Sequence, residues 1–524
     1  MTKQWPRDGK RELTDQLRLL SHPEIVIGLA GPIGIDIEGM ADEVGRALGE
    51  VGYQHRSIRI TELMSRYEAP EVDRMGDDYF SAMNFKMDYA NKLCELARDP
   101  AALMWIAIEG IKEQRKAILL DEGATATVAS DVAFVIRQLK RPDEVELLRR
   151  VYGKRFVLIS GYGSQHHRLE RITEKGRASL PLSAEEPEIA KRALALLLRD
   201  EHEGGSKHVQ HLRDTFHHAD VFVDGINREQ MRSGIERFFQ AFFGRVDIGP
   251  SKIEYGMYAA KAASLRSTDL SRQVGSAIFT SDGEVVAQGC NEVPRAFGGT
   301  YWSGEEPDFR DIKLGHDPND VLKKDVIRDF LERLQKVGLL KVDDDSDVSS
   351  DEFVEKLLGR GDAEDHQLGC LVGSYVNDLT EYGRVVHAEM VAICDAARLG
   401  KPIKGCLLYV TTFPCHNCTK HIIASGINRV FYLEPYPKSR AKQLHSNEIE
   451  IEKSSSNKVS FLPFLGISPY RYRDIFEKGS RKSGAKAKVW YAPDDKPRPI
   501  VPETLPKYVE LEDIEIDKIS GWLP

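Results

Sequence analysis

His387-Ala388-Glu389 and Pro414-Cys415-His416-Asn417-Cys418 each begin a predicted helix in the second half of the chain. Apolar runs predict a strand between the two motifs, at 407–411, and another after them, at 429–433. The two helices are expected over 387–398 and 415–424. This alternation predicts an α/β unit built around the two helix starts.

The side chains of the two motifs have the types and the spacing of a zinc site. Cys415 and Cys418 are one helical turn apart, so both sulfurs can point to one side of a helix start. The unpaired N–H groups and the helix dipole at that start favour the thiolate form that binds metal. His387 supplies a third ligand, and three protein ligands leave a fourth position for water, as in catalytic zinc sites. Glu389 is placed to transfer protons as general acid and base.

Other interpretations of the cysteine pair remain open. A redox pair has the same spacing, although the sequence lacks a thioredoxin-like setting for it. A structural zinc would need a fourth ligand, for which His416 and His421 are the nearest candidates. His366 and Cys370 are candidates for part of a second metal site, and ordinary packing is the alternative for them.

The remainder of the second half predicts further strands and an insertion. The expected elements are a helix at 254–265 and strands at 275–279 and 285–290. Ser281-Asp282-Gly283 is a hairpin signal between the two strands. From about 298 to 384 the pattern is irregular, which predicts a partly helical insertion. After residue 492 the chain is rich in proline and charge, so we expect a loosely ordered tail over 493–524.

The first half alternates apolar runs with amphipathic stretches. Strands are expected at 25–30, 132–139, 156–160 and 219–223, and helices at 36–48, 144–152, 190–199 and 229–243. Such alternation predicts a mostly parallel sheet with helices on both faces. The periodicity breaks at 244–251, so we predict one α/β domain over 1–248 and a second over 249–492.

A glycine loop, Gly28-Leu29-Ala30-Gly31-Pro32-Ile33-Gly34, follows the first strand and precedes a helix, which is the setting of a phosphate-binding loop. It resembles the P-loop of nucleotide kinases as far as Gly34. Ile35-Asp36-Ile37-Glu38 then stands where a lysine and a hydroxyl residue hold phosphates and magnesium. We expect a kinase-like domain with weak or absent phosphoryl transfer, in which Gly28, Gly31 and Gly34 can still bind a nucleotide through backbone N–H groups. Further candidates for this site, with surface charge as the alternative, are Arg168, Arg171 and the stretch 213–218.

Composition limits the class of protein. The 524 residues include 73 basic and 82 acidic side chains, and the formal charge of −9 argues against a surface that grips duplex nucleic acid. The sequence has no run of about 18 apolar residues, and Met1–Pro6 contains no apolar signal-peptide core. We therefore expect a cytoplasmic protein without a membrane span. Seven cysteines are too few and too scattered for a disulfide framework.

Three segments resemble the cytidine/deoxycytidylate deaminase superfamily, and in particular its deoxycytidylate branch. They are Ser271–Ile278, Gly289–Pro294 and Gly426–Val430, within a resemblance that covers roughly 254–300 and 384–446. The resemblance implies a sheet flanked by helices, a Zn2+ cofactor and a deoxycytidine nucleotide substrate. It also implies that Asn291 contacts the deoxyribose and Arg272 a phosphate; a turn residue and a solvated arginine are the alternatives. Cys290 and Glu292 depart from the family's commoner Tyr and Gly, so the sugar pocket is expected to differ in detail.

A tighter resemblance is to bacterial anti-phage dCTP deaminases of the AvcD-like group, which join a nucleotide-kinase-like half to a deaminase. It depends on Asn291–Pro294, Tyr301-Trp302, Asp308–Asp311 and Glu434–Ser439. The group converts dCTP, and often dCMP, to the uracil forms and so drains the dCTP pool during phage replication. This resemblance also implies, as in some members, control by a small RNA, whereas the resemblance to the deoxycytidylate branch implies a homo-oligomer and a deoxynucleotide effector.

Four residues of these segments are candidates for a nucleotide pocket: Trp302, Arg310, Tyr436 and Lys438. Aromatic rings can stack on a base, and cations can hold a polyphosphate. Ordinary packing is the alternative for the two aromatic residues.

Together these features predict a zinc-dependent hydrolase that removes the C4 amine of deoxycytidine nucleotides, with dCTP as first-choice substrate and dCMP as second. A polynucleotide deaminase acting on tRNA or single-stranded DNA is one alternative, but the excess of acidic over basic residues argues against this class. Another is a nucleotide-sensing regulator that uses the deaminase fold as a binding module. Glu389 speaks against that second alternative, because a pure binder has no need of a general acid and base.

Overall fold

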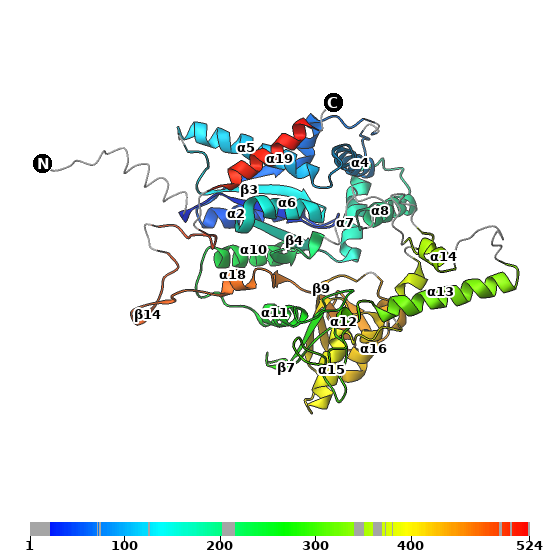
Figure 1. The fold of residues 1–524 in the computed structure, drawn as a ribbon. Coiled ribbons are helices and arrows are strands. Elements are labelled where there is room, and N and C mark those ends of the chain that lie inside the picture. The colour runs from blue at the N-terminus through cyan, green and yellow to red at the C-terminus, as the bar shows by residue number, and fades with distance from the viewer. Residues whose placement is uncertain are drawn as a thin grey trace. The chain divides into compact units, whose positions relative to one another are not determined.

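The chain forms two compact units in a computed structural model. Unit 1 combines residues 1–254 with residues 465–524, and unit 2 is residues 255–464. Figure 1 shows the elements of both units. The structure describes residues 21–70, 72, 75–123, 126–201, 215–339, 350–359, 369–371, 374–379, 381–436, 438–491, 495–502 and 506–521.

Unit 1 is built on a six-stranded sheet with the strand order β12-β5-β4-β1-β3-β2. Its strands are β1 (Ile25–Ala30), β2 (Gln54–Arg59), β3 (Val132–Leu139), β4 (Phe156–Tyr162), β5 (Val221–Asp224) and β12 (Gly466–Ile467). The first five are parallel, and β12 pairs antiparallel with β5 at one edge. Parallel strands that are covered on both faces need continuous apolar sequence, and β1 is buried at every position. The predicted parallel sheet in an α/β unit is confirmed.

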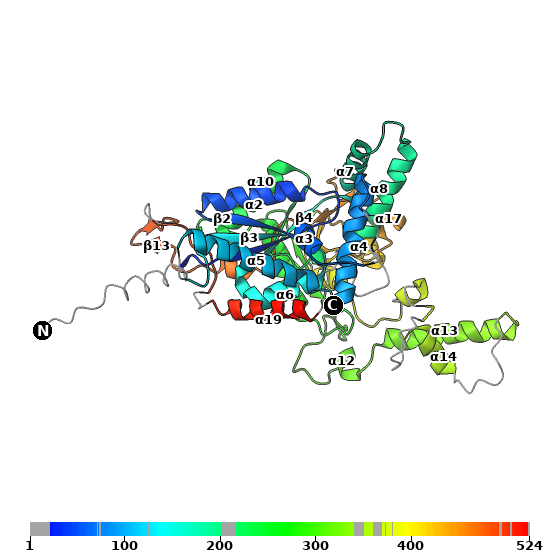
Figure 2. The same cartoon turned by 90° about the horizontal axis from the view of Figure 1, so that it is seen from above.

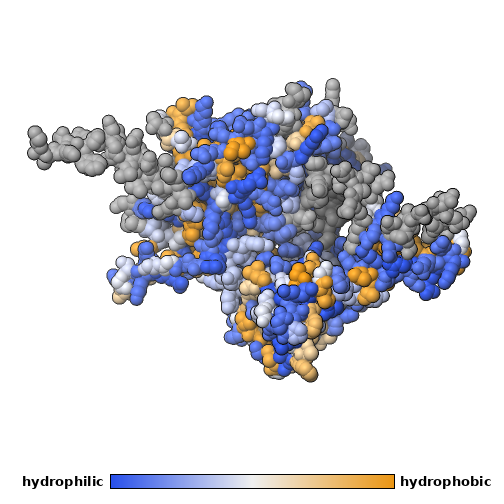
Figure 3. All heavy atoms as spheres, viewed as in Figure 1, coloured by the Kyte–Doolittle hydropathy of each residue, from blue (hydrophilic) through white to orange (hydrophobic). Residues whose placement is uncertain are grey.

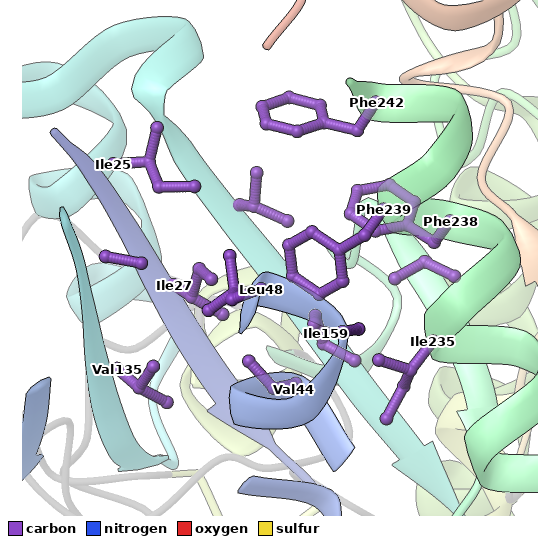
Figure 4. Close-up of a cluster of buried hydrophobic side chains, with 14 of the residues drawn as sticks. Ile25, Ile27, Val44, Leu48, Val135, Ile159, Ile235, Phe238, Phe239 and Phe242 are labelled. Atoms are coloured by element: carbon purple, nitrogen blue, oxygen red, sulfur yellow. The ribbon is translucent and has the colours of Figure 1, made fainter. Parts of the chain in front are cut away.

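Helices cover both faces of this sheet. They are α2 (Ile37–Glu50), α3 (Ile60–Leu63), α4 (Tyr79–Ala97), α5 (Ala102–Asp121), α6 (Pro142–Tyr152), α7 (Gln165–Ser179), α8 (Glu186–Glu201), α10 (Arg228–Phe242), α18 (Tyr472–Phe476) and α19 (Tyr508–Ser520). Figure 2 shows α2 and α10 on one side of the strands and α5, α6 and α19 on the other. On the first side, Phe238 and Phe239 of α10 pack against Ile27 and Ile159 of the strands (Figure 4). Each of these side chains is at most 1% exposed, and burying one contributes roughly 1.5–3 kcal/mol.

The C-terminal segment returns to unit 1. Helix α19 lies along α5 (Figure 1). Its Glu512 is fully buried, and Oε2 of Glu512 accepts a hydrogen bond from Nη1 of Arg115 at 2.7 Å. Arg115 also binds Glu24 through Nη2 at 2.6 Å, and Tyr508 donates a hydrogen bond to Glu24 at 2.7 Å. The prediction of a loosely ordered tail is therefore corrected for 508–520. Its buried carboxylate has a partner 397 positions earlier in the chain, which local composition could not reveal.

Unit 2 contains a second six-stranded sheet, with the order β10-β11-β9-β8-β6-β7. Its strands are β6 (Gly275–Phe279), β7 (Val285–Cys290), β8 (Leu407–Thr412), β9 (Arg429–Glu434), β10 (Ile449–Ile451) and β11 (Val459–Pro463). Strands β8, β9, β11 and β10 are parallel, whereas β6 pairs antiparallel with both β8 and β7. The unit ends at Phe464, before the predicted boundary at 492, because the following residues form β12 in the sheet of unit 1.

The helices of unit 2 include the two that begin at the motifs. They are α11 (Lys252–Ser264, which starts at the boundary), α12 (Asp311–Leu314), α13 (Pro318–Lys336), α14 (Ser350–Leu357), α15 (Ala388–Arg398), α16 (His416–Ser425) and α17 (Ala441–Leu444). Helices α15 and α16 share an apolar core with the sheet, in which Ala388, Ala392, Cys418 and Ile422 are at most 1% exposed. Helices α12, α13 and α14 belong to the predicted insertion at 298–384, which is partly helical as expected.

Polar side chains dominate the face drawn in Figure 3, with apolar residues scattered among them. None of the helices in the described part of the chain combines the length and the apolar character that crossing a bilayer requires.

Candidate metal centre and substrate cavity

The two motifs lie at the first residues of neighbouring helices in unit 2. His387 is the N-cap of α15, and Cys415, three residues after β8, is the N-cap of α16. The sulfur of Cys415 accepts a hydrogen bond from the backbone N–H of Cys418 at 3.4 Å. A serine or aspartate oxygen fills this role at most helix starts. The cap of α16 thus positions the Cys415 sulfur, whereas His387 makes no capping hydrogen bond with its side chain.

His387, Cys415 and Cys418 form the predicted donor cluster. The Nδ1 atom of His387 lies 3.4 Å from each of the two cysteine sulfurs, and the three donor atoms lie within 4.8 Å of one another. Zinc bonds of about 2.3 Å to sulfur and about 2.0 Å to nitrogen place tetrahedral ligands roughly 3.5 Å apart. Among the described residues this is the one group of three or more such donors close enough to share an ion. The cluster is thus compatible with zinc.

The charges of the three donors are coupled. Hydrogen bonds from Cys418 and His387 lower the pKa of the Cys415 thiol to about 4. The hydrogen bond to Cys415 raises the pKa of His387 to about 9, against the effect of burial. The hydrogen bond to Cys415, together with burial, raises the pKa of Cys418 well above its usual range. A cation that binds the cluster must therefore displace protons from His387 and Cys418, because only the deprotonated forms are ligands.

Glu389 lies in the first turn of α15, beside the donor cluster, and is 4% exposed. Burial raises the pKa of its carboxyl group to about 7. A carboxyl group that titrates near neutrality can both accept and donate a proton under physiological conditions. Its position and its pKa suit the predicted role in proton transfer.

A cavity of about 340 Å³ adjoins the cluster, a size typical of small-molecule sites. His387, Glu389 and Cys415 line it. Four of the predicted substrate residues line it as well: Arg272, Asn291, Tyr436 and Lys438. The guanidinium carbon of Arg272 lies 5.3 Å from the centre of the Tyr436 ring, a cation–π contact. The structure therefore brings these four residues to the predicted metal ligands.

The other two predicted substrate residues are engaged elsewhere in unit 2 and do not line this cavity. Trp302 is 52% exposed, and the guanidinium carbon of Arg266 lies 4.0 Å from the centre of its ring. Arg310 is 4% exposed and binds the carboxylate of Asp308 through Nε at 2.9 Å and Nη2 at 2.7 Å. Arg266 and Asp308 are thus the partners that the structure gives to Trp302 and Arg310, and the predicted role of these two residues in a nucleotide pocket stays a prediction.

The insertion supplies part of the cavity wall, which the sequence did not predict. Asp311 and Arg384 form an ion pair of 2.8 Å in this wall, and Asp320 pairs with Lys323 at 3.0 Å. Irregular patterning at 298–384 marked an insertion but gave no sign of its position. Asp269 also lines the cavity and was missed, although it lies three residues before Arg272.

The glycine loop of unit 1 connects β1 to α2 as predicted, and Gly34 has the positive φ of 95° that favours glycine. The backbone N–H of Ile33 donates to Oδ2 of Asp200 at 2.7 Å. The Lys140 ammonium group binds the same carboxylate at 2.6 Å and the carbonyl oxygen of Gly31 at 3.1 Å. A carboxylate of the chain itself therefore accepts a hydrogen bond from the glycine loop.

The remaining sequence candidates are spread over the chain. Arg171 lies 3.7 Å from Asp36, the N-cap of α2, and Arg168 donates to the carbonyl oxygen of Gly163. In the stretch 213–218, Arg213 and Asp214 lie outside the described residues, as does His366. Cys370 and His421 are exposed, and His416 is half-buried. None of the last three belongs to the donor cluster among the described residues.

The comparisons with known proteins concern the part of the chain that carries this site. Residues 250–434 match the family described as the cytidine and deoxycytidylate deaminase zinc-binding region. ComE operon protein 2 of Bacillus subtilis is 33% identical over 109 residues, which are 18% of this chain and 55% of that protein. The deoxycytidylate deaminase of Enterobacteria phage T4 is 47% identical over 55 residues, 10% of this chain and 28% of that protein. The chain thus spans about half, or less, of the length of these relatives.

A solved structure of the dCMP deaminase from the cyanophage S-TIM5, in complex with dCMP and dUMP, is 17% identical to the chain. It covers 41% of this chain and 99% of its own, with a TM-score of 0.22, which is too low to bear on the fold. The donor cluster, the family match and the curated relatives agree on one class. Residues 250–434 form a domain of the cytidine and deoxycytidylate deaminase superfamily.

Proposed function

We propose that the protein is a zinc-dependent hydrolase that deaminates deoxycytidine nucleotides, dCTP first and dCMP second, to the deoxyuridine nucleotides and ammonia. One observation carries the proposal. The three donors of His387, Cys415 and Cys418 lie within 4.8 Å of one another, and the buried Glu389 lines the same 340 Å³ cavity. A binding module would need the cavity but not a buried carboxyl group beside a metal site.

The residues of the chain divide the chemistry between them. When bound, a zinc ion supplies Lewis-acid polarisation and an activated water. Glu389 would take one proton from that water and place it on the N3 atom of cytosine, then take the second proton from the new C4 hydroxyl and give it to the departing C4 amine. Its pKa of about 7 matches both transfers. The carbonyl oxygen that replaces the amine comes from the water, so the products are uracil nucleotide and ammonia.

The cavity lining supports a nucleotide rather than a free base. Arg272 and Lys438 are exposed cations at the cavity, suited to hold phosphate oxygens. Tyr436 offers an aromatic ring at the same cavity. The order of preference, dCTP before dCMP, follows from the resemblance to the AvcD-like deaminases. Asn291 is proposed to face the deoxyribose.

Unit 1 is proposed to be a nucleotide-kinase-like domain that has lost phosphoryl transfer and regulates the deaminase or builds the oligomer. Its five parallel strands run in the order β5-β4-β1-β3-β2, with the glycine loop after the central strand. The loop lacks the phosphate-binding lysine, and Asp200 accepts its Ile33 N–H.

The resemblance also supports a biological proposal. The protein acts in the cytoplasm as an anti-phage defence that depletes dCTP. It works as a homo-oligomer under the control of a deoxynucleotide effector and a small RNA. Infection of cells that express the wild type or Glu389→Ala, with dCTP quantified over time, tests the depletion, which only the wild type should show.

The catalytic proposal is tested by uracil-nucleotide formation from dCTP, dCMP, CTP and cytidine with the zinc-loaded protein. Glu389→Ala should retain zinc and lose at least about a hundredfold in turnover. Glu448→Ala, which removes a half-exposed carboxylate outside the cavity, is the matched control and should behave as the wild type. Turnover of tRNA or single-stranded DNA but of no free nucleotide would replace the proposal with the polynucleotide alternative. Nucleotide binding without turnover would favour the regulator.

A further inference from the structure

Asp269 and Asn291 meet in the wall of the cavity that contains Glu389. The side-chain amide of Asn291 donates to Oδ2 of Asp269 at 3.1 Å and to the carbonyl oxygen of Arg272 at 3.3 Å. Its carbonyl oxygen accepts from the backbone N–H of Ala388 at 2.9 Å, at the start of α15. Asn291 is therefore fixed in one orientation, with both amide hydrogens used within the protein.

Asp269 has acceptor capacity that these contacts do not use. Its Oδ1 accepts from the backbone N–H of Ser271 at 3.1 Å, so the contacts with described residues occupy two of about four lone-pair positions. It forms no ion pair with a described residue. In the same wall Asp311 is bound by Arg384, and Asp320 by Lys323. Asp269 is thus a carboxylate at the cavity that forms no ion pair within 4 Å among the described residues, although its charge contributes to the raised pKa of His387.

The segment that carries Asp269 is held rigidly by Glu292, which is 1% exposed. Oε2 of Glu292 accepts from both the backbone N–H and the hydroxyl of Thr268, at 3.1 and 2.9 Å. Its Oε1 accepts from the backbone N–H of Val293 at 3.0 Å. The acceptor of Asp269 is therefore fixed in place before a ligand enters.

We propose that Asp269 is a specificity-determining residue that accepts a hydrogen bond from the 3′-hydroxyl of the deoxyribose. The inference rests on the proposed function and deepens it. A deoxycytidine nucleotide carries two hydrogen-bond donors, the C4 amine and the 3′-hydroxyl. The amine must face Glu389 to be removed, and a carboxylate repels the phosphates. The 3′-hydroxyl is the donor that remains for Asp269, and Asn291 holds the carboxylate in position.

The test compares a substrate with its analogue that lacks this hydroxyl. The wild type should use dCTP at least about tenfold better in kcat/KM than 2′,3′-dideoxy-CTP, because the analogue leaves a charged acceptor unsatisfied. Asp269→Ala should narrow that ratio to within about threefold, and Asp269→Asn, which keeps the shape, should give a value between. Asp282→Ala, at the exposed turn between β6 and β7, should keep the wild-type ratio.

Two results would overturn the inference: a wild-type ratio within threefold, or a wild-type ratio retained in Asp269→Ala. The same comparison by calorimetry, with dCMP and 2′,3′-dideoxy-CMP as ligands, gives the ratio of Kd values without turnover. It therefore decides the role of Asp269 even if the wild type deaminates nothing. A wild type that deaminates no nucleotide would refute the proposed function, whereas the calorimetry would still decide the role of Asp269.

Discussion

In unit 1 the buried charged groups face one another, whereas in unit 2 several of them face a cavity. Arg115 lies between Glu24 and Glu512, and Asp200 joins Lys140 to the glycine loop. In unit 2 the thiols of the donor cluster, with Glu389 and Asp269, line or adjoin a space large enough for a small molecule. Burying a charge without a partner costs several kcal/mol. The difference supports the proposal that unit 2 binds a cation and a substrate, whereas these buried charges of unit 1 stabilise its fold.

The largest effect is expected from the donor cluster. Cys415→Ala removes the most acidic thiol and one of three ligands, so bound zinc should fall from about one per chain to a small fraction, and turnover at least about a thousandfold. Elemental analysis and the deamination assay measure the two quantities. Cys394→Ala, at an exposed cysteine of α15, is the matched control and should keep both. If Cys415→Ala retained zinc, the metal site would lie outside the donor cluster.

The next effect tests internal pairing in unit 1. Arg115→Met leaves Glu24 and Glu512 as uncompensated buried charges and should lower the free energy of unfolding by about 3–5 kcal/mol. Lys112→Met breaks an exposed ion pair with Asp513 between the same two helices, and should cost about 1 kcal/mol or less. Denaturant unfolding measures both. Equal effects would show that α19 is not held by the buried pair.

A smaller effect is expected at the glycine loop. Asp200→Ala leaves the Ile33 N–H and the Lys140 ammonium without their acceptor, at a cost of about 2–3 kcal/mol. Zinc content should be unchanged, because the loop belongs to unit 1 and the cluster to unit 2. Asp200→Asn keeps one acceptor and should lose less. If Asp200→Ala unfolds as the wild type does, the carboxylate does not secure the loop.

The smallest effect concerns a carboxylate whose partners are half-exposed. Hydrogen bonds from Arg232, Arg228 and Arg46 lower the pKa of Glu43 to about 2 in the folded chain. Its contribution to stability is therefore complete above the unfolded pKa of about 4.3 and is lost as the pH falls through 2. Glu43→Gln should cost about 1 kcal/mol at pH 7, given the exposure of the arginines. The difference from the wild type should narrow below pH 4, and a constant difference would contradict the assigned cause.

The donor cluster could be predicted because its ligands are local. Cys415 and Cys418 are separated by one turn, and His387 starts the neighbouring helix, so spacing and helix starts contained the information. Strands with continuous apolar sequence, such as β1 and β3, were located at their full length for the same reason. Strand β2 was missed because five of its six residues are not fully buried and its sequence, Gln-His-Arg-Ser-Ile-Arg, lacks an apolar run.

The parts that could not be predicted depend on residues distant in sequence. Asp200 reaches the glycine loop across 167 positions, and Glu512 reaches Arg115 across 397. The loop motif was visible locally, but the carboxylate that accepts its N–H was not. Arg310 and Trp302 had the right chemistry for a phosphate and a base, yet Asp308 and Arg266 are their partners. The residue types indicated which ligands these side chains can bind, but only the fold determined which residues they contact.

The central claim is that the cluster and Glu389 together form a deaminase centre for deoxycytidine nucleotides. The most direct measurement is uracil-nucleotide formation from dCTP and dCMP by wild type and Glu389→Ala, with zinc quantified in the same samples. The account predicts about one zinc per chain in both proteins, and turnover in the wild type alone. Equal turnover in the two proteins would contradict the role of Glu389. Zinc without turnover of either nucleotide would contradict the assignment of the substrate.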